Sequence, residues 1–254
     1  MATPIEGSVA IVTGGNRGIG EAFVRALIAG GAAKVYVGSR DPANAQHLVE
    51  EGQGKVVALT LDVARPDQIA AAAKAATDVT IVVNNAGAFL NQRLIGAETM
   101  DAAREEMEVN YFGLLGMCRA FAPALKANGG GAIVNILSSG GVVAVPAMGG
   151  YSPSKFAARA ASTSIRAELA KQGTSVSALI VGSVDTRMAA HVAGAKETPA
   201  DIAKIGLSAI KRGTDEIDTD RMAIEVRAHK ARDPKAQERA LARMLDMETI
   251  STGR

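Results

Sequence analysis

The sequence has a single cysteine and no apolar run long enough to cross a membrane. Cys118 alone cannot form an intramolecular disulfide bond or a cysteine-rich metal site, so we expect it to be a small buried apolar residue of a helix. Because no stretch of about 18 apolar residues occurs, a membrane span is not expected. The N-terminus has no basic segment followed by an apolar signal core, which favours a cytoplasmic location.

An excess of one sign of charge is also absent. The chain has 28 Lys and Arg residues against 26 Asp and Glu residues, and no run of Lys or Arg forms a stripe. A nucleic-acid-binding surface is therefore not expected. The three histidines, His47, His191 and His229, lack the spacing of metal ligands, so we expect them at the surface and assign no metal site.

The composition is typical of a soluble globular protein. Of the 254 residues, 48% are apolar and 21% are charged, which is enough apolar material for a packed core. This length fits one large α/β domain or two small ones. Because no low-complexity linker interrupts the chain, we predict a single domain over residues 1–254.

Short runs rich in valine and isoleucine alternate with alanine-rich helical segments. The strand-like runs are 8–13, 34–39, 55–61, 79–85, 131–137 and 175–181. The periodicity of apolar residues indicates helices at about 18–29, 43–51, 66–76, 102–127 and 152–171. This order predicts an α/β fold with a doubly wound parallel sheet of the Rossmann type. Its ligand crevice is expected at the carboxyl ends of the strands.

Two segments lie outside this alternation. Residues 186–213 begin at the carboxyl edge of the sixth strand, where a covering lid would sit, and Met188, His191 and Val192 are candidates for substrate contact. After a short strand, the charged segment 219–247 is expected to be helical.

The segment TGGNRGIG joins the first predicted strand to the first predicted helix. Its Gly14, Gly18 and Gly20 allow a sharp turn, after which the N–H groups of the helix start can hold a pyrophosphate. The spacing G-x-x-x-G-x-G differs from the common dinucleotide fingerprint G-x-G-x-x-G. A tight turn that only packs the helix on the sheet is the alternative interpretation.

Tyr151 and Lys155 lie one helical turn apart in the segment GGYSPSKFAARA. This spacing puts both side chains on one face, as it would in any helix-surface pair. A tyrosine with a pKa near ~10 is a poor acid or base, and a neighbouring ammonium group lowers that pKa. The pair is therefore a candidate for proton transfer.

Taken in order, these motifs resemble those of the short-chain dehydrogenase/reductase family. The family pattern is T-G-x-x-x-G-x-G, then N-N-A-G, an Asn in the next helix, a Ser and Y-x-x-x-K. This chain matches it with Thr13 to Gly20, Asn84 to Gly87, Asn110, Ser138, and Tyr151 with Lys155. The resemblance covers about residues 8–190, and within the family the chain resembles NADP(H)-dependent carbonyl reductases. It implies hydride transfer between NADP(H) and a small-molecule carbonyl or secondary alcohol.

The resemblance also implies four catalytic residues. Tyr151 would exchange the proton of the substrate oxygen, and Lys155 would lower the tyrosine pKa and bind the nicotinamide ribose. Ser138 would hold the substrate oxygen; it lies three residues after Asn135 and thirteen before Tyr151, the family intervals, which Ser139 misses by one. Asn110 would kink its helix and hold a water that links Lys155 to solvent.

The end of the second predicted strand bears on the choice of cofactor. Where relatives that use NAD carry an acid, this chain has Ser39 and then Arg40, and Arg17 lies in the glycine loop. A guanidinium group can bind a 2'-phosphate, so we predict NADP(H). Asp41 is the counter-argument, since it lies about 20 residues past the loop, as the acid of the fingerprint does. We interpret it as the N-cap region of the next helix, before Pro42.

The remaining cofactor-binding residues follow from the resemblance alone: Asn16, Ile19, Asp62, Val63, Asn85, Ala86, Gly87, Val184 and Thr186. For Asp62 and Val63 a strand-end cap is an equal alternative, and Asn85 has a purely structural alternative. Val181 replaces the proline that many relatives carry, a change expected to loosen the turn leading to Val184.

Other functions remain compatible with these motifs. On the same fold, the substrate could be a quinone, a carbon–carbon double bond or a sugar, or the chain could be a sensor that binds NADP(H) without turnover. The family interface on the two long helices favours a homodimer or a homotetramer. The C-terminus lacks the glycine-rich ending that packs across one tetramer axis in many relatives.

Overall fold

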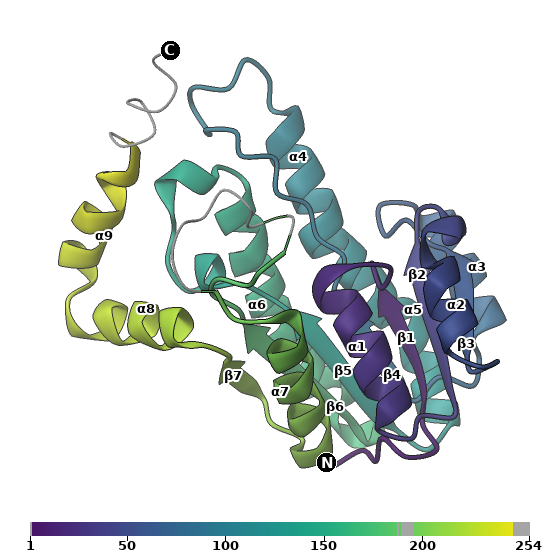
Figure 1. The fold of residues 1–254 in the computed structure, drawn as a ribbon. Helices are drawn as coiled ribbons and strands as arrows, with labels where there is room; N and C mark the ends of the chain where they lie inside the picture. The colour runs from purple at the N-terminus through teal and green to yellow at the C-terminus, as the bar shows by residue number, and fades with distance from the viewer. Residues whose placement is uncertain (1, 187, 189–195, 246–254) are drawn as a thin grey trace.

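Seven parallel strands form one twisted sheet in the order β3-β2-β1-β4-β5-β6-β7 (Figure 1). The computed structural model describes residues 2–186, 188 and 196–245. The strands are β1 (Val9–Thr13), β2 (Lys34–Ser39), β3 (Val56–Thr60), β4 (Ile81–Asn84), β5 (Gly131–Ile136), β6 (Thr174–Ile180) and β7 (Glu216–Asp218). The six runs predicted as strands and the short C-terminal strand are confirmed, and the Rossmann-type α/β fold with them.

Helices cover both faces of the sheet (Figure 1). The α-helices are α1 (Gly18–Ala29), α2 (Gln46–Glu51), α3 (Pro66–Ala75), α4 (Asp101–Met107), α5 (Leu114–Ala127), α6 (Tyr151–Leu169), α7 (Pro199–Arg212), α8 (Arg221–Arg232) and α9 (Pro234–Ala242). The 3-10 turns are η1 (Pro42–Ala45), η3 (Ser139–Gly141), η4 (Pro146–Met148) and η5 (Ala170–Gln172), and η2 (Glu108–Gly113) is a π-helical turn. Strands covered on both faces explain the continuous Val and Ile runs.

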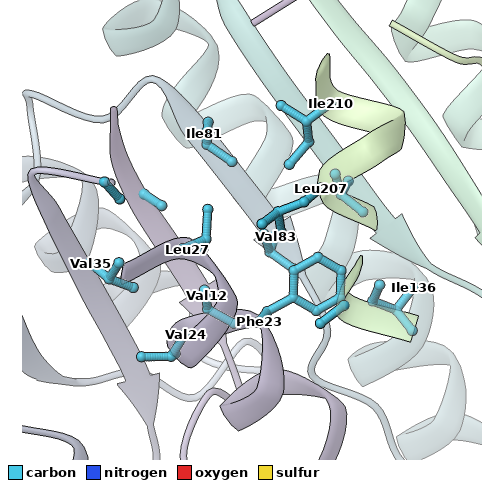
Figure 2. Close-up of a cluster of buried hydrophobic side chains, with 14 of the residues drawn as sticks. Val12, Phe23, Val24, Leu27, Val35, Ile81, Val83, Ile136, Leu207 and Ile210 are labelled. Carbon is cyan, nitrogen blue, oxygen red and sulfur yellow. The ribbon is translucent and has the colours of Figure 1, made fainter. Parts of the chain in front are cut away.

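Adjacent residues of each central strand enter different cores. In β1, Val12 joins the core beneath α1 and α7, whereas Ile11 joins the core beneath α3, α5 and α6. Figure 2 shows the first of these cores, in which Phe23 of α1 lies against Leu207 of α7. The alternation follows from the two-residue period of a strand.

The predicted lid over 186–213 is wrong for its second half. Residues 199–212 form α7, whose Ile202, Leu207 and Ile210 are buried in the first core. These three residues recur at helical spacing and give the helix one apolar face, which packs on the sheet instead of covering the crevice. Residues 187 and 189–195, and with them the candidates His191 and Val192, lie outside the described residues. Met188 is exposed.

The helix predicted over 102–127 is interrupted in its middle. The π-helical turn η2 separates α4 from α5, and Asn110 lies within it. This is the kink that was expected at Asn110. An inserted π-helical turn changes the direction of the side chains before and after it, and such turns are frequent at functional sites.

The C-terminal helices are attached to the edge of the sheet by ion pairs. Arg159 of α6 binds Glu216 of β7 at 2.8 Å, and Arg227 of α8 binds Asp218 at 2.6 Å. Beyond them, the Lys230 ammonium lies over the Phe156 ring, 5.2 Å from its centroid. These contacts hold α8 beside α6, and α9 follows α8 (Figure 1).

Three smaller expectations were also tested. Cys118 is buried in α5, as predicted, and burial raises the pKa of its thiol to about 12. His47 and His229 are exposed. Within the described ranges, no helix is both long enough and apolar enough to span a membrane.

Gly206 tests the close packing of α7 on α1. A Cβ atom built there would lie 2.2 Å from Cζ of Phe23. We expect Gly206→Ala to lower the free energy of unfolding by about 1–3 kcal/mol, because overpacking a buried contact outweighs the helix propensity gained by alanine. Urea denaturation measures this change.

Gly116→Ala in α5 is the matched control. A Cβ there would lie 3.0 Å from Cδ1 of Ile69, the mobile end of a side chain. Its free energy of unfolding should therefore stay the same or rise by up to about 1 kcal/mol, because alanine has the higher helix propensity. Equal effects at Gly206 and Gly116 would show that the α1–α7 contact is not tightly packed.

Candidate active site

Hydrogen bonds join the carboxyl ends of β1 and β4. The Thr13 hydroxyl accepts from the backbone N–H groups of Asn85 and Ala86, both at 3.0 Å. In return, the Asn85 amide donates to the carbonyl oxygens of Thr13 and Gly14, also at 3.0 Å. The glycine loop and the segment after β4 are thus held together, which is the structural role considered for Asn85.

The glycines of the loop are required by its geometry. Gly14 and Gly18 have φ angles of 59° and 55°, which disfavour other residues. A Cβ atom at Gly20 would lie 2.3 Å from the Gly14 carbonyl oxygen and 2.5 Å from the Asn85 amide nitrogen. The N-cap residue of α1, Arg17, makes no side-chain capping bond, so the first-turn N–H groups are available to an anion. A pyrophosphate fits this loop.

After the end of β2, Arg40 is exposed, whereas the carboxylate of Asp41 is engaged in a hydrogen bond. The Ser39 hydroxyl is buried and donates to the Asp41 carbonyl oxygen at 2.5 Å. The Asp41 carboxylate accepts from the N–H of Ala43 at 3.0 Å and caps η1, as predicted. Arg40 and Arg17 are exposed. The acid that argued against NADP(H) is therefore engaged in a helix cap.

The other residues assigned to the cofactor lie around the same edge. Asp62 accepts from the N–H of Ala64 at 3.0 Å and so caps the end of β3, whereas Val63 is buried in the second core. Val184 is buried in the first core. Thr186 faces the glycine loop, since a Cβ at Gly18 would lie 3.5 Å from its Cγ2.

The last members of the set are Asn16, Ile19, Ala86 and Gly87. Asn16 is half-buried within the loop, and Ile19 packs against the first core. The Cα of Ala86 lies 3.2 Å from the position of a Cβ at Gly14. Gly87 is exposed. All four lie on the glycine loop or on the segment joined to it, so the structure brings the whole set to one edge of the sheet.

Tyr151 begins α6 and lies beside Ser138. Burial raises the pKa of the tyrosine hydroxyl, and a hydrogen bond with the Ser138 side chain lowers it. Ser138 itself caps η3 by accepting from the N–H of Gly140 at 3.1 Å. The Phe89 ring meets the Tyr151 ring edge-on, with the centroids 5.1 Å apart. The hydroxyl groups of Ser138 and Tyr151 therefore lie next to each other at the end of β5.

Lys155 is a buried lysine one turn after the tyrosine. Its ammonium group donates to the Ile136 carbonyl oxygen at 3.1 Å and lies 5.6 Å from the centroid of the Tyr151 ring. Burial lowers its pKa to about 8. A cation near a phenol favours the phenolate, so the geometry suits a tyrosine that gives up its proton.

Asn110 binds the backbone of the segment that follows β4. Its side-chain oxygen accepts from the N–H of Ala88, and its side-chain nitrogen donates to the Ala88 carbonyl oxygen, both at 2.9 Å. The same nitrogen donates to Ser154 at 2.9 Å. A Cβ at Gly87 would lie 3.1 Å from the Asn110 oxygen and 3.7 Å from Nζ of Lys155. Gly87 thus opens the space that both side chains face.

An aspartate takes over the turn that a proline holds in many relatives. The N–H of Gly182 donates to the Asp220 carboxylate at 2.6 Å, and the same carboxylate caps α8 through Ala223 at 2.9 Å. The predicted loosening at Val181 is therefore opposed by a contact from the C-terminal segment. The sequence showed the cap signal before α8, but no local signal linked Asp220 to Gly182.

Sequence reasoning also missed Glu106. This residue of α4 is completely buried, and its carboxylate accepts from the N–H of Leu90 at 2.7 Å. Its electrostatic effect raises the pKa of Tyr151. The available signal was its position, one turn before Asn110 on the same side of the helix.

Comparison with known proteins agrees with this arrangement. The family model for short chain dehydrogenases matches residues 8–197. A 3-alpha-(or 20-beta)-hydroxysteroid dehydrogenase of Mycobacterium bovis is 34% identical over 199 residues, 74% of this chain and 73% of that protein. A galactitol 2-dehydrogenase (L-tagatose-forming) of Cereibacter sphaeroides is 38% identical over 191 residues, 72% of this chain and 74% of that protein.

Solved structures show the same similarity. A short chain dehydrogenase from Burkholderia cenocepacia, crystallised in complex with NADP, has a TM-score of 0.88 at 41% identity and covers 95% of this chain and 99% of its own. A 7 alpha-hydroxysteroid dehydrogenase complexed with NADH and 7-oxo glycochenodeoxycholic acid has a TM-score of 0.77 at 25% identity, covering 85% and 94%. The resemblance drawn from the motifs is confirmed: this chain belongs to the short-chain dehydrogenase/reductase family.

Proposed function

We propose that this protein is an NADP(H)-dependent oxidoreductase that interconverts a carbonyl compound and a secondary alcohol. The observation that carries the proposal is the meeting of Tyr151, Ser138 and Lys155 at the edge of the sheet that also holds the glycine loop. Family membership supports the reaction class. The names of two relatives, a hydroxysteroid dehydrogenase and a galactitol dehydrogenase, support a secondary alcohol or ketone over a quinone.

The side chains have distinct tasks in this proposal. Ser138 holds the carbonyl oxygen beside Tyr151, whose hydroxyl donates the proton that the developing alkoxide needs. Lys155 places a positive charge near the phenol and so stabilises the phenolate left behind. When bound, NADPH supplies the hydride. Asn110 keeps the segment after β4 against α4 and α6 through its three hydrogen bonds.

The charge at the end of β2 supports NADP(H) over NAD(H). Arg40 and Arg17 are exposed near the loop, and the carboxylate of Asp41 is used as a cap. A 2'-phosphate at this position would contact guanidinium groups, and the carboxylate of Asp41 is already hydrogen-bonded as a helix cap. One solved relative carries NADP and another NADH, so the cofactor is argued from these residues and not from family membership.

The assembly proposed is a homodimer built on α5 and α6. A groove between these helices is lined by Leu115, Ala122, Ala161 and Leu169, among other residues, and the family resemblance favours an interface there. Light scattering on the purified protein tests it, and a monomer would contradict it. A sensor that binds NADP(H) without turnover is less well supported, since the tyrosine and lysine are both kept.

Replacing the tyrosine tests the proposed reaction. Tyr151→Phe removes the proton donor, so we expect carbonyl-dependent oxidation of NADPH to fall to a few per cent or less of the wild-type rate, with NADPH binding retained. The assay follows NADPH absorbance over a panel of ketones, aldehydes and quinones. Tyr111→Phe, on η2, is the matched control and should keep full activity. Substantial turnover by Tyr151→Phe would refute the assigned role.

Replacing the arginine tests the cofactor. Arg40→Ala should lower kcat/KM for NADPH at least about tenfold, because a hydrogen bond to a charged group is worth about 1.5–3 kcal/mol, and should leave kcat/KM for NADH nearly unchanged. Arg119→Ala, an exposed arginine on α5, is the control. A wild-type kcat/KM with NADH that equals the value with NADPH would overturn the choice.

The proposed role of Lys155 predicts how kcat/KM for alcohol oxidation depends on pH. For alcohol oxidation Tyr151 must lose its proton, so kcat/KM rises with pH towards the tyrosine pKa. Burial raises that pKa and lowers the pKa of Lys155 to about 8. While Lys155 stays protonated, its charge, 5.6 Å from the centroid of the tyrosine ring, opposes the rise. Lys155→Met should move the inflection of the pH profile to higher pH. An inflection that stays in place would show that Lys155 does not act on Tyr151.

A further inference from the structure

Two side chains from one face of the α4–η2 helix bind alternate residues of the segment after β4. Asn110 pairs with both backbone groups of Ala88, and Glu106 accepts from the N–H of Leu90 at 2.7 Å. The two side chains are four residues apart, one helical turn, and the backbone residues they bind are two apart. The helix therefore clamps this segment as a neighbouring strand would.

Phe89 lies between the two anchored residues. Its ring meets the Tyr151 ring at an interplanar angle of 69° and a centroid separation of 5.1 Å. An edge-to-face pair of this kind restricts both rings. The chain of contacts runs from Glu106 through Leu90 and Phe89 to the tyrosine.

Glu106 also faces the start of α6. A Cβ at Gly150, the residue before Tyr151, would lie 2.8 Å from Oε2 of Glu106. This oxygen is buried and makes no hydrogen bond with any protein atom that the structure describes. A buried acid with one oxygen bonded and the other aimed at the first turn of the catalytic helix needs a functional explanation.

We propose that Glu106 is a positioning residue that holds Tyr151 for proton transfer, acting through Leu90 and Phe89. This rests on the proposed function, in which Tyr151 donates the proton. The role needs the hydrogen-bond acceptor of the side chain and not its charge. A negative charge at this place would oppose formation of the phenolate.

The surroundings favour the neutral form. Burial raises the pKa of Glu106, the charge of Glu105 raises it further, and only the Leu90 N–H favours ionisation. The titratable groups near Tyr151 are Lys155, on its own helix, and Glu106, on α4. Ser138, at the end of β5, shares a hydrogen bond with the tyrosine hydroxyl. An ionised Glu106 and a protonated Lys155 would shift the pKa of the tyrosine in opposite directions.

Three variants separate the hydrogen bond from the charge. Glu106→Ala removes the acceptor, Glu106→Gln keeps an acceptor and is neutral at every pH, and Glu108→Ala removes an exposed acid from the adjoining turn η2 as a control. Hydrogen–deuterium exchange at the Leu90 amide reports the anchor without any turnover. Carbonyl-dependent NADPH oxidation, NADPH affinity and the pH profile of kcat/KM report the effect on Tyr151.

In Glu106→Ala, we expect exchange at Leu90 to speed up and kcat to fall about tenfold or more, as misplaced catalytic groups do, while NADPH affinity stays within about twofold. Glu106→Gln should restore both the slow exchange and kcat, with the wild-type pH profile. Glu108→Ala should match wild type throughout.

Different failures have different meanings. Unchanged exchange at Leu90 in Glu106→Ala, or unchanged kcat despite faster exchange, would overturn the positioning role. A Glu106→Gln variant that binds Leu90 but has a shifted pH profile would overturn the claim that the role needs the acceptor and not the charge. If the wild type reduces no carbonyl compound, the proposed function fails, whereas the Leu90 exchange still tests the anchor.

Discussion

The junction between Thr13 and Asn85 is the constraint on which the rest of the site depends. Reciprocal hydrogen bonds at 3.0 Å join the start of the glycine loop to the segment after β4. The first segment is the glycine loop proposed to bind the cofactor phosphates, and the second leads to the residues beside Tyr151. Because Gly20 lies directly against this junction, a side chain there would displace the Gly14 carbonyl or the Asn85 amide. The proposed positions of cofactor and substrate therefore both depend on this one pair of residues.

A second set of buried polar contacts connects helix α6 to strands β4 and β5. Asn84 donates to Asn135, Asn135 to Ser162 and Ser162 to the Ala158 carbonyl oxygen, at 2.8–2.9 Å. This chain crosses from β4 through β5 to α6 inside the second core. A buried polar network fixes one arrangement of its members, because each lost bond leaves an unsatisfied group. It holds α6, and with it Tyr151 and Lys155, in one position relative to the sheet.

Sequence patterns predicted most of the fold and the residues of the site, for physical reasons. Several motifs follow strand ends, so the predicted alternation of parallel strands and helices was enough to place Gly14, Asn85 and Ser138 at one edge of the sheet. Helix α7 lies where a lid was predicted. The segment contains many polar residues, but Ile202 and Ile210 recur at helical spacing and pack it on the sheet. Contacts between distant segments gave no signal: the bond from Asp220 to Gly182 and the anchor of Leu90 on Glu106 depend on tertiary packing.

The central claim is that Tyr151 and the glycine loop serve one reaction at a carbonyl group. The most direct measurement follows a label from NADPH carrying deuterium at C4 of the nicotinamide to the product of a reduced ketone, by mass spectrometry. The account predicts that one of the two C4 positions gives its deuterium to the carbinol carbon, in wild type and not in Tyr151→Phe. Consumption of NADPH with no deuterium in the alcohol would contradict it.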